Sequence, residues 1–191
     1  MINMILMDDI IRDGHPSLRE EAEEIEFPLS SELKTLADEM IEFLKNSQDY
    51  DTAEKYDLRP GVGIAAPQLN VKKRMFAMHI PAELDEAEPT SIVMINPRII
   101  RHSVQTTALQ DGEGCLSIDE IHEGFVPRNK RITVEYYDLD GNKIKERFKG
   151  YPAIVVQHEV DHLNGILFYD HINPFDPFSR AGNLEIFEEE N

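Results

Sequence analysis

The chain has 191 residues, of which 41% are hydrophobic and 29% charged, so it can bury a core and has an ordinary globular composition. Its net charge of −18, from 19 basic and 37 acidic residues, repels phosphate backbones and anionic lipid and argues against DNA binding or a membrane-surface role. No segment approaches the ~20 apolar residues of a membrane span. The single Cys115 cannot form an internal disulfide, so a reducing, cytoplasmic setting is expected.

The first predicted element is a helix over residues 30–46. Ser31 is the expected N-cap residue. The polar, aperiodic residues 47–60 that follow predict a surface loop. The helix prediction rests on apolar residues at helical spacing: Leu33, Leu36, Ala37, Met40, Ile41 and Leu44.

The next segment, "GVGIAAPQ" at residues 61–68, shares the spacing of a dinucleotide fingerprint. No strand precedes it, however, and Pro67 would break the helix that should follow, so a dinucleotide site is rejected. Its small residues would let an extended peptide lie against the protein backbone as an added strand. The amide of Gln68 could donate to a developing oxyanion. From these residues alone, a glycine- and alanine-rich turn is an equally good interpretation.

Strands are predicted in the middle of the chain. An acidic turn at residues 81–90 separates the first two strand segments, and Asp140-Gly141 marks the turn of a hairpin whose arms alternate in character. Three segments are expected to contain these strands: residues 74–80, 91–100 and 131–148.

A second helix is predicted over residues 151–170, with Pro152 in its first turn. It contains His158-Glu159-Val160-Asp161-His162, the H-E-x-x-H pattern of zinc hydrolases. On a helix the two histidines lie about 40° apart, and Glu159 lies roughly 60° further round, where it can face a bound water without ligating the metal. The alternative is two histidines hydrogen-bonded inside the core. The apolar flanks make an unpaired imidazole costly there and favour a metal site.

A third protein ligand is needed besides the two histidines, because a catalytic site of this type uses three protein ligands and one open position. In one protease class a third His follows at the position that Phe168 occupies here. The candidates are His171, His122, an acidic residue and Cys115. Cys115 is favoured over its alternative role as a small buried hydrophobic residue, because a thiolate is the best partner for an ion held by two imidazoles. Such a set suits Zn²⁺ or Fe²⁺ rather than Mg²⁺ or Ca²⁺.

Grouped strands and two well-separated helices favour an α+β fold over an alternating β-α-β arrangement. We expect antiparallel strands and hairpins packed around a central metal-binding helix, with one further N-terminal helix. The N-terminal residues have no basic leading region and are expected to belong to the mature protein. The whole chain, residues 1–191, is expected to form a single catalytic domain.

Three segments together resemble one family, the peptide deformylases. "GVGIAAPQ", "EGCLS" (residues 113–117) and "QHEVDH" (residues 157–162) look like that family's signature motifs, in the same order and at similar spacing. The resemblance extends from about residue 8 to residue 170. It implies an enzyme that removes the formyl group from the N-terminal formyl-methionine of newly made polypeptides and releases formate.

The resemblance also implies a role for each site residue. Glu159 would be the general acid/base, and the Gln68 side chain and the Leu116 backbone N–H would hold the oxyanion. The metal ligands would be Cys115, His158 and His162. The substrate would be bound by Gly61, Val62 and Gly63 along its backbone, and by Ile154 and Val155 around the methionine side chain.

The implied cofactor is one divalent transition metal per chain, Fe²⁺ in cells and Zn²⁺ or Ni²⁺ in purified protein. The implied partners are nascent formyl-Met polypeptides, with a transient association with the ribosome and no DNA or membrane. The "EGCLS" form and the long segment before "GVGIAAPQ" resemble the Gram-positive branch of the family. The branch best known at the ribosome has a basic C-terminal helix, whereas this chain ends "NLEIFEEEN", which argues against docking through the tail.

Two other functions remain as alternatives. A metallo-endopeptidase built on the same helix should supply a third His or a downstream Glu, and it would cleave casein. A non-enzymatic protein with a structural metal would close the fourth coordination position with another protein ligand, and it would not bind a hydroxamate.

Overall fold

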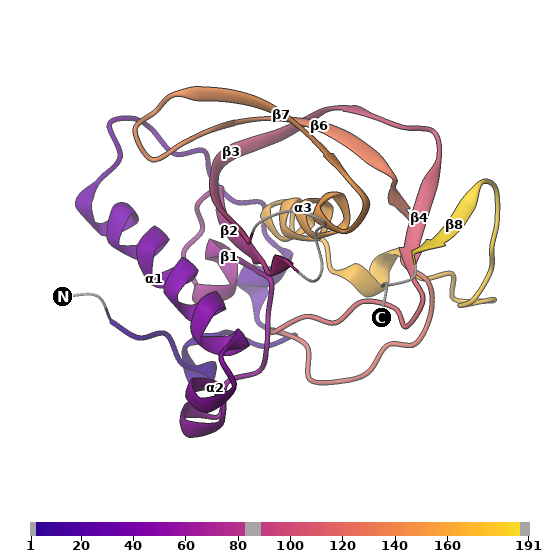
Figure 1. Ribbon diagram of the computed structural model, residues 1–191, viewed down its shortest axis with the longest axis horizontal. Coiled ribbons are helices and arrows are strands. Elements are labelled where there is room, and N and C mark those ends of the chain that lie inside the picture. The colour runs from indigo at the N-terminus through magenta and orange to yellow at the C-terminus, as the bar shows by residue number, and fades with distance from the viewer. Residues whose placement is uncertain (1–2, 83–88, 188–191) are drawn as a thin grey trace.

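The main sheet of the protein has five strands in the order β1-β2-β3-β6-β7, and every neighbouring pair is antiparallel (Figure 1). The structure is a computed structural model, and it describes residues 3–82 and 89–187. The strands of this sheet are β1 (Gly63–Ala65), β2 (Met75–Ile80), β3 (Thr90–His102), β6 (Arg131–Tyr137) and β7 (Lys143–Lys149).

A smaller sheet has β4 at its centre, antiparallel to β5 on one side and parallel to β8 on the other. Its strands are β4 (Thr106–Leu109), β5 (Arg128–Asn129) and β8 (Leu184–Phe187). The segment near the C-terminus therefore lies beside the middle of the chain. We did not predict β8, because four residues among carboxylates give little alternation to detect.

Two helices cover opposite faces of the strands β1, β2 and β3. They are α1 (Ser31–Gln48) and α3 (Gly150–Leu163). Successive residues of β2 point to opposite faces, so Met75 and Ala77 pack in the core with α1, whereas Phe76 and Met78 pack in the core with α3. The strand is consequently apolar on both faces, as its sequence shows.

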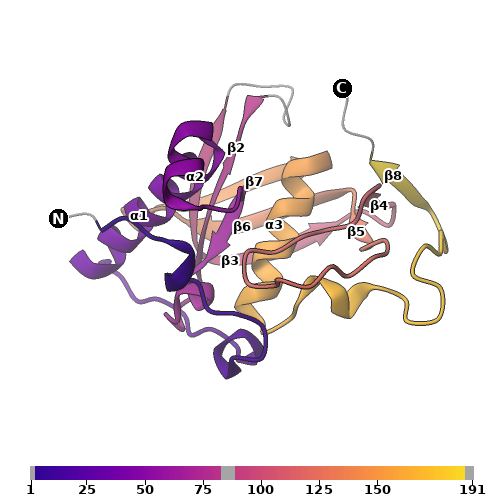
Figure 2. The ribbon, with the colours of Figure 1, turned by 90° about the horizontal axis from the view of Figure 1, so that it is seen from below.

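The helix α3 lies in the middle of the molecule, seen end-on in Figure 1, with β3, β6 and β7 curving over it. In Figure 2 the same helix runs along these strands, with α1 and α2 on the far side of the sheet. Its apolar residues pack against the inward-facing residues Ile132, Val134 and Phe148. The register between β3 and β6 shifts twice, and Asn96 in β3 adopts a φ of 49°; such irregularities bend a sheet and let it wrap around a helix.

The predicted α+β architecture is confirmed, with corrections at the ends of both helices. The N-cap of α1 is Ser30, whose side chain accepts a hydrogen bond from the Leu33 N–H at 3.3 Å, not Ser31. The helix α3 ends at Leu163, well before the predicted residue 170. Gly165 ends it, because its φ of +69° is left-handed and its tight approach to the Arg19 backbone leaves no room for a Cβ atom.

Part of the predicted loop 47–60 is helical, because α2 (Tyr50–Tyr56) begins after Asp49, whose side chain caps the N–H of Thr52. An N-cap and about two turns of mostly polar residues carry too little apolar periodicity to predict such a short helix. The three strand segments and the hairpin turn at Gly141 are confirmed. Residues 83–88 of the acidic turn lie outside the described residues. Among the described helices, none has the length and apolar character that crossing a membrane requires.

Candidate metal centre

Two histidines on α3 and one cysteine from the loop after β4 form a compact group of potential metal ligands. The ligand atoms of Cys115, His158 and His162 all lie within 4.8 Å of one another. The Cys115 Sγ atom is 3.3 Å from His162 Nε2, and both side chains are buried. One thiolate and two imidazoles suit a transition metal such as zinc or iron and leave a fourth position free. The described residues therefore contain a Cys-His-His metal-binding group.

Glu113 fixes the orientation of His158. Its Oε1 atom lies 2.7 Å from His158 Nδ1, which leaves Nε2 as the atom free to ligate a metal. Arg128 holds Glu113 in turn through two hydrogen bonds of 2.9 Å, and a third from Arg128 reaches Asp161 at 2.5 Å. Asp161 is also 2.7 Å from His171 Nε2. The predicted ligand His158 thus stands at the end of a buried chain of charged side chains.

The charges in this chain depend on one another. Burial by itself raises the pKa of Glu113, but the charge of Arg128 and the hydrogen bonds from His158 and Arg128 outweigh it and hold that pKa at about 2. Burial lowers the pKa of Arg128, and the carboxylates of Glu113 and Asp161 more than reverse this and raise it. The ionised carboxylate can therefore support His158 with a side chain that is only 4% exposed.

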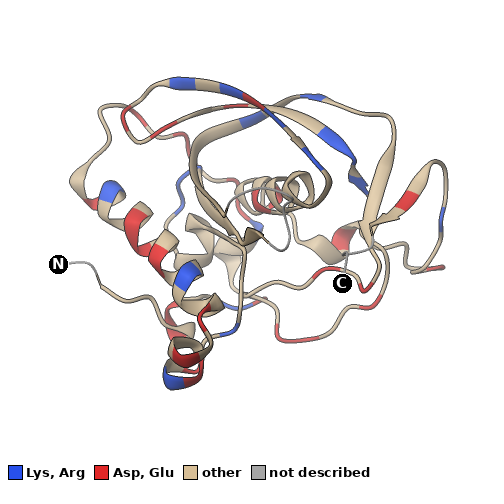
Figure 3. Ribbon diagram, in the orientation of Figure 1, with Lys and Arg blue, Asp and Glu red and all other residues tan. Residues whose placement is uncertain are grey.

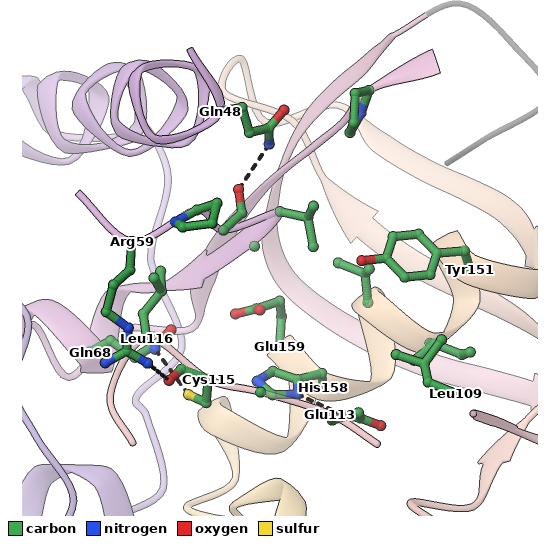
Figure 4. A pocket seen from close by; sticks show the side chains of 18 residues that line it. Gln48, Arg59, Gln68, Leu109, Glu113, Cys115, Leu116, Tyr151, His158 and Glu159 are labelled. Atoms are coloured by element: carbon green, nitrogen blue, oxygen red, sulfur yellow. Dashed lines mark hydrogen bonds and ion pairs between the residues drawn. The ribbon is translucent and has the colours of Figure 1, made fainter. Parts of the chain in front are cut away.

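Glu159 points into the same pocket from α3, as Figure 4 shows. Its side chain is 3% exposed, and among the described residues its Oε2 atom has no hydrogen-bonding partner. Burial, the largest influence, raises the pKa of Glu159 to about 7. A carboxylate in this state can both accept and return a proton near neutral pH.

Gln68 reaches the metal-binding group from the short 3-10 turn η3 (Ala66–Leu69), which follows β1 directly. Its Oε1 atom accepts a hydrogen bond from the Ala65 N–H at 2.8 Å, which orients the amide. Its Nε2 atom is 3.1 Å from Ser117 Oγ and 3.6 Å from Cys115 Sγ. The donor end of the amide is therefore turned toward the metal-binding group (Figure 4).

A pocket of about 420 Å³ opens beside these residues. Every predicted site residue except His162 lines it, and His162 Nε2 lies 3.3 Å from Cys115 Sγ. The residues predicted to bind substrate are thus brought together: Gly61, Val62, Gly63, Ile154 and Val155. Leu116 also lines the pocket, with its side chain against Gly61.

The other histidines considered as ligands lie outside the group. His171 is hydrogen-bonded to Asp161, and the ring of His122 stacks on Tyr169 with 4.2 Å between ring centroids. Phe168, at the position of the third histidine in the protease pattern, packs nearly parallel to the ring of His158. Phe168 therefore packs against the predicted ligand His158 and offers no ligand atom itself.

Sequence reasoning missed Arg59, which anchors the loop that carries the cysteine. Its guanidinium donates to the carbonyl oxygens of Cys115 at 2.8 Å and Ile118 at 3.0 Å, and to Asp119 Oδ1 at 2.6 Å. Five donors in a rigid fork let one arginine hold several acceptors at once. A lone arginine in a polar loop gives no signal for such a role.

The comparisons with known proteins agree with this geometry. The family described as Polypeptide deformylase matches residues 7–178. The chain belongs to the peptide deformylase family. A peptide deformylase of Ligilactobacillus salivarius is 60% identical over 186 residues, covering 97% of this chain and 100% of the relative. One of Listeria monocytogenes is 56% identical over 184 residues, covering 96% and 100%.

The fold of a solved deformylase is also similar. The crystal structure of peptide deformylase from Thermotoga maritima shares 36% identity with this chain at a TM-score of 0.69, covering 86% of this chain and 97% of the other. The predicted family is therefore confirmed, and the two relatives named from Gram-positive bacteria agree with the predicted branch. Deformylase membership does not favour the metallo-endopeptidase alternative.

Proposed function

We propose that this deformylase family member is a metal-dependent hydrolase that removes the formyl group from the N-terminal formyl-methionine of newly made polypeptides, releasing formate. The observation that carries the proposal is the meeting of three features in one pocket. These are the Cys-His-His group, the buried carboxylate of Glu159 and the amide of Gln68. Membership of the family supplies the substrate class.

The metal ligands are Cys115, His158 and His162 in this proposal. Their donor atoms are close enough to share one ion, and the contact between Glu113 and His158 Nδ1 presents Nε2 to it. A divalent transition metal held there supplies a Lewis acid and lowers the pKa of a bound water. Fe²⁺ is the expected ion in cells, and Zn²⁺ or Ni²⁺ would suit the same ligands in purified protein.

Glu159 acts as the general acid/base. It takes a proton from the attacking water and later gives it to the nitrogen of the leaving methionine, so the C–N bond of the formamide breaks and formate and a free amine result. Its burial and its unpartnered Oε2 atom support this role, because that oxygen has no competing protein donor among the described residues.

Two N–H groups stabilise the oxygen of the formyl group as it gains negative charge. One is the Gln68 amide, whose donor end already faces the metal-binding group. The other is the backbone N–H of Leu116, next to Cys115 on the wall of the pocket. Donors fixed in place before the reaction stabilise such charge without reorganising, and loss of one typically slows turnover by about 10²–10³-fold.

The substrate backbone pairs with Gly63 in β1. This strand is at the edge of the five-stranded sheet, and among the described residues only β2 pairs with it, so an extended peptide can add beside Gly63 on its other edge. Gly61 and Val62 continue the same wall. The methionine side chain enters the apolar part of the pocket beside Ile154 and Val155 on α3.

The cellular setting in this proposal is the cytoplasm, where nascent formyl-Met chains are the partners and a transient association with the ribosome brings the enzyme to them. Residues 1–191 act together as one catalytic domain. The family match across residues 7–178 supports this. It includes the helices α1, α2 and α3 and every described strand except β8.

Competition between formyl-Met-Ala-Ser and acetyl-Met-Ala-Ser tests the function. The formyl carbon carries hydrogen where acetyl carries a methyl group, and displacing the attacked carbon by about 1 Å can slow the reaction ~100-fold. We expect formate release and at least that preference for the formyl peptide, with no cleavage of casein in parallel. Comparable rates on the two peptides, or casein cleavage, would contradict the proposal.

A further inference from the structure

Five exposed cations lie together on the sheet face that points away from α3. On β6 and β7, inward-facing residues such as Ile132, Val134 and Phe148 pack with α3, so the alternate residues point outward. The outward cations without an ion pair among the described residues, here called the basic face, are Arg101, Arg131, Lys145, Arg147 and Lys149; Arg98 and Lys143 also point outward but pair with Glu24 and Glu135. Figure 3 shows blue segments along β3, β6 and β7, whereas α1 and the loops below them carry mostly red.

These cations are set apart from the rest of the charge. Among the described residues, none of the five makes an ion pair, although the chain holds 37 acidic residues. Many cations elsewhere do contact carboxylates, for example Arg59, Lys72, Lys73 and Arg128. The excess of acid in the chain therefore does not neutralise this part of its surface.

Over most of the basic face the strand register places like charges next to one another, whereas Lys145 lies opposite Glu135. Arg131 is directly opposite Lys149, and Arg101 and Arg147 flank Thr133 from the two neighbouring strands. Like charges opposite each other destabilise a sheet, typically by a few tenths of a kcal/mol per pair. An anionic partner seated between them would remove this repulsion.

A hollow of about 470 Å³ lies among the same residues. Four of the five cations line it, namely Arg101, Arg131, Arg147 and Lys149, and Thr133 lines it between them. No residue of this hollow lines the pocket beside the metal-binding group, so a partner on the basic face leaves that pocket open.

We infer that the basic face docks the phosphodiester backbone of RNA. Cations on alternate residues of β7, from Lys145 through Arg147 to Lys149, recur roughly every 7 Å, because each strand residue advances ~3.3 Å. A linear row of charges at this interval suits a chain of phosphates. The arginines beside the row supply planar forks that bind phosphate oxygens through paired hydrogen bonds.

Local charge governs such contact more than the net charge of −18 does. At physiological ionic strength, exposed charges more than about 8 Å apart are largely screened from one another. The carboxylates of α1 lie on a separate part of the molecule (Figure 3), so they weaken long-range attraction without blocking the contact. The choice of RNA among polyanions rests on the proposed function, because nascent formyl-Met chains emerge from the ribosome, which is rich in RNA.

The test compares two triple variants of the full-length, metal-loaded protein. Arg101→Gln/Arg147→Gln/Lys149→Gln removes three charges from the basic face. Lys34→Gln/Lys45→Gln/Lys55→Gln removes three exposed charges from α1 and α2. The probes are protein-free ribosomal RNA and, separately, vesicles of phosphatidylglycerol and phosphatidylcholine, each titrated at several salt concentrations.

Wild type and the helix variant should bind the RNA with a Kd on the order of 1–100 µM near physiological salt. The basic-face variant should bind at least about ten-fold more weakly, with a salt slope smaller by roughly 2–3, since each phosphate contact contributes ~0.7–0.9. All three proteins should hydrolyse formyl-Met-Ala-Ser equally, which separates this inference from the proposed function and confirms folding. No RNA binding by wild type, equal binding by both variants, or a preference for the vesicles would overturn it.

Discussion

Gly63 and Glu159 approach each other so closely that a Cβ atom on Gly63 would lie 2.4 Å from the Glu159 Oε1 atom. Real Cβ atoms do not come that near to an oxygen, so one of the two groups would have to move. The glycine belongs to the edge strand β1 and the glutamate to α3, two elements in direct contact. The absence of a side chain on Gly63 therefore creates the space in which the proposed acid/base sits.

Gly63→Ala should consequently slow the enzyme while leaving its metal in place. The added methyl group would push the Glu159 carboxylate aside, and a shift of about 1 Å at a reacting group can lower the rate ~100-fold. The measurement is kcat/KM on formyl-Met-Ala-Ser, together with metal content by elemental analysis. Gly61→Ala is the matched comparison, because the three atoms nearest to its Cβ would all belong to the flexible side chain of Leu116, the closest at 3.0 Å. Equal losses in the two variants would contradict the steric explanation.

Cys115→Ala should lose its metal or bind it far more weakly. The thiolate is one of three donors in the group, and the buried pair of imidazoles that remains cannot complete a three-ligand site. The check is the metal content of anaerobically purified protein. Ser117→Ala is the control, because the Ser117 side chain is buried in the same loop and accepts a hydrogen bond from Gln68 but is not one of the three donors. Full occupancy in Cys115→Ala would exclude the cysteine as a ligand.

Glu159→Gln should keep its metal and lose turnover by about 10²–10⁴-fold, the usual contribution of a positioned acid/base. Glutamine has nearly the same shape and cannot accept the proton. The variant should still bind a hydroxamate, which needs the open metal position but no proton transfer. Activity close to wild type would leave the proposed mechanism without its acid/base.

The members of the Cys-His-His group could be predicted from the sequence, because helical spacing and donor type can be read from the chain alone; the catalytic roles of the site residues stay predictions. His158, Glu159 and His162 fall on one side of a helix by spacing alone, and Cys115 follows from the donor type that two imidazoles lack. The strand pattern likewise marks β2 and β3, whose apolar residues lie in the core or pack against it.

The supporting residues could not be predicted, because their partners are distant in sequence and carry no periodic signal. Arg128 meets Glu113 and Asp161 from a two-residue strand, and Arg59 reaches the Cys115 loop from another loop. The strand β8 is recognisable only through its pairing with β4. Such contacts are decided by the folded chain as a whole. The basic face was not predicted either. The net charge of a chain does not show which cations the strand register places side by side.

Removing Arg128 should weaken both the fold and the metal site. Its guanidinium is 3% exposed and lies between Glu113 and Asp161. Arg128→Met would leave two buried carboxylates without their cation, and breaking a buried pair in this way typically costs about 3–5 kcal/mol. In a chain of this length that corresponds to a fall in Tm of roughly 6–20 °C.

Metal affinity should drop as well, by about 10–100-fold, because Glu113 would no longer be fixed against His158. Thermal unfolding and metal titration measure the two effects. Lys73→Met removes a comparable but largely exposed ion pair with Glu23 and should change the free energy of unfolding by less than about 1 kcal/mol, with no effect on metal binding. A variant Arg128→Met as stable as Lys73→Met would show that the buried carboxylates do not depend on Arg128. Normal metal affinity in that variant would show that Glu113 orients His158 without it.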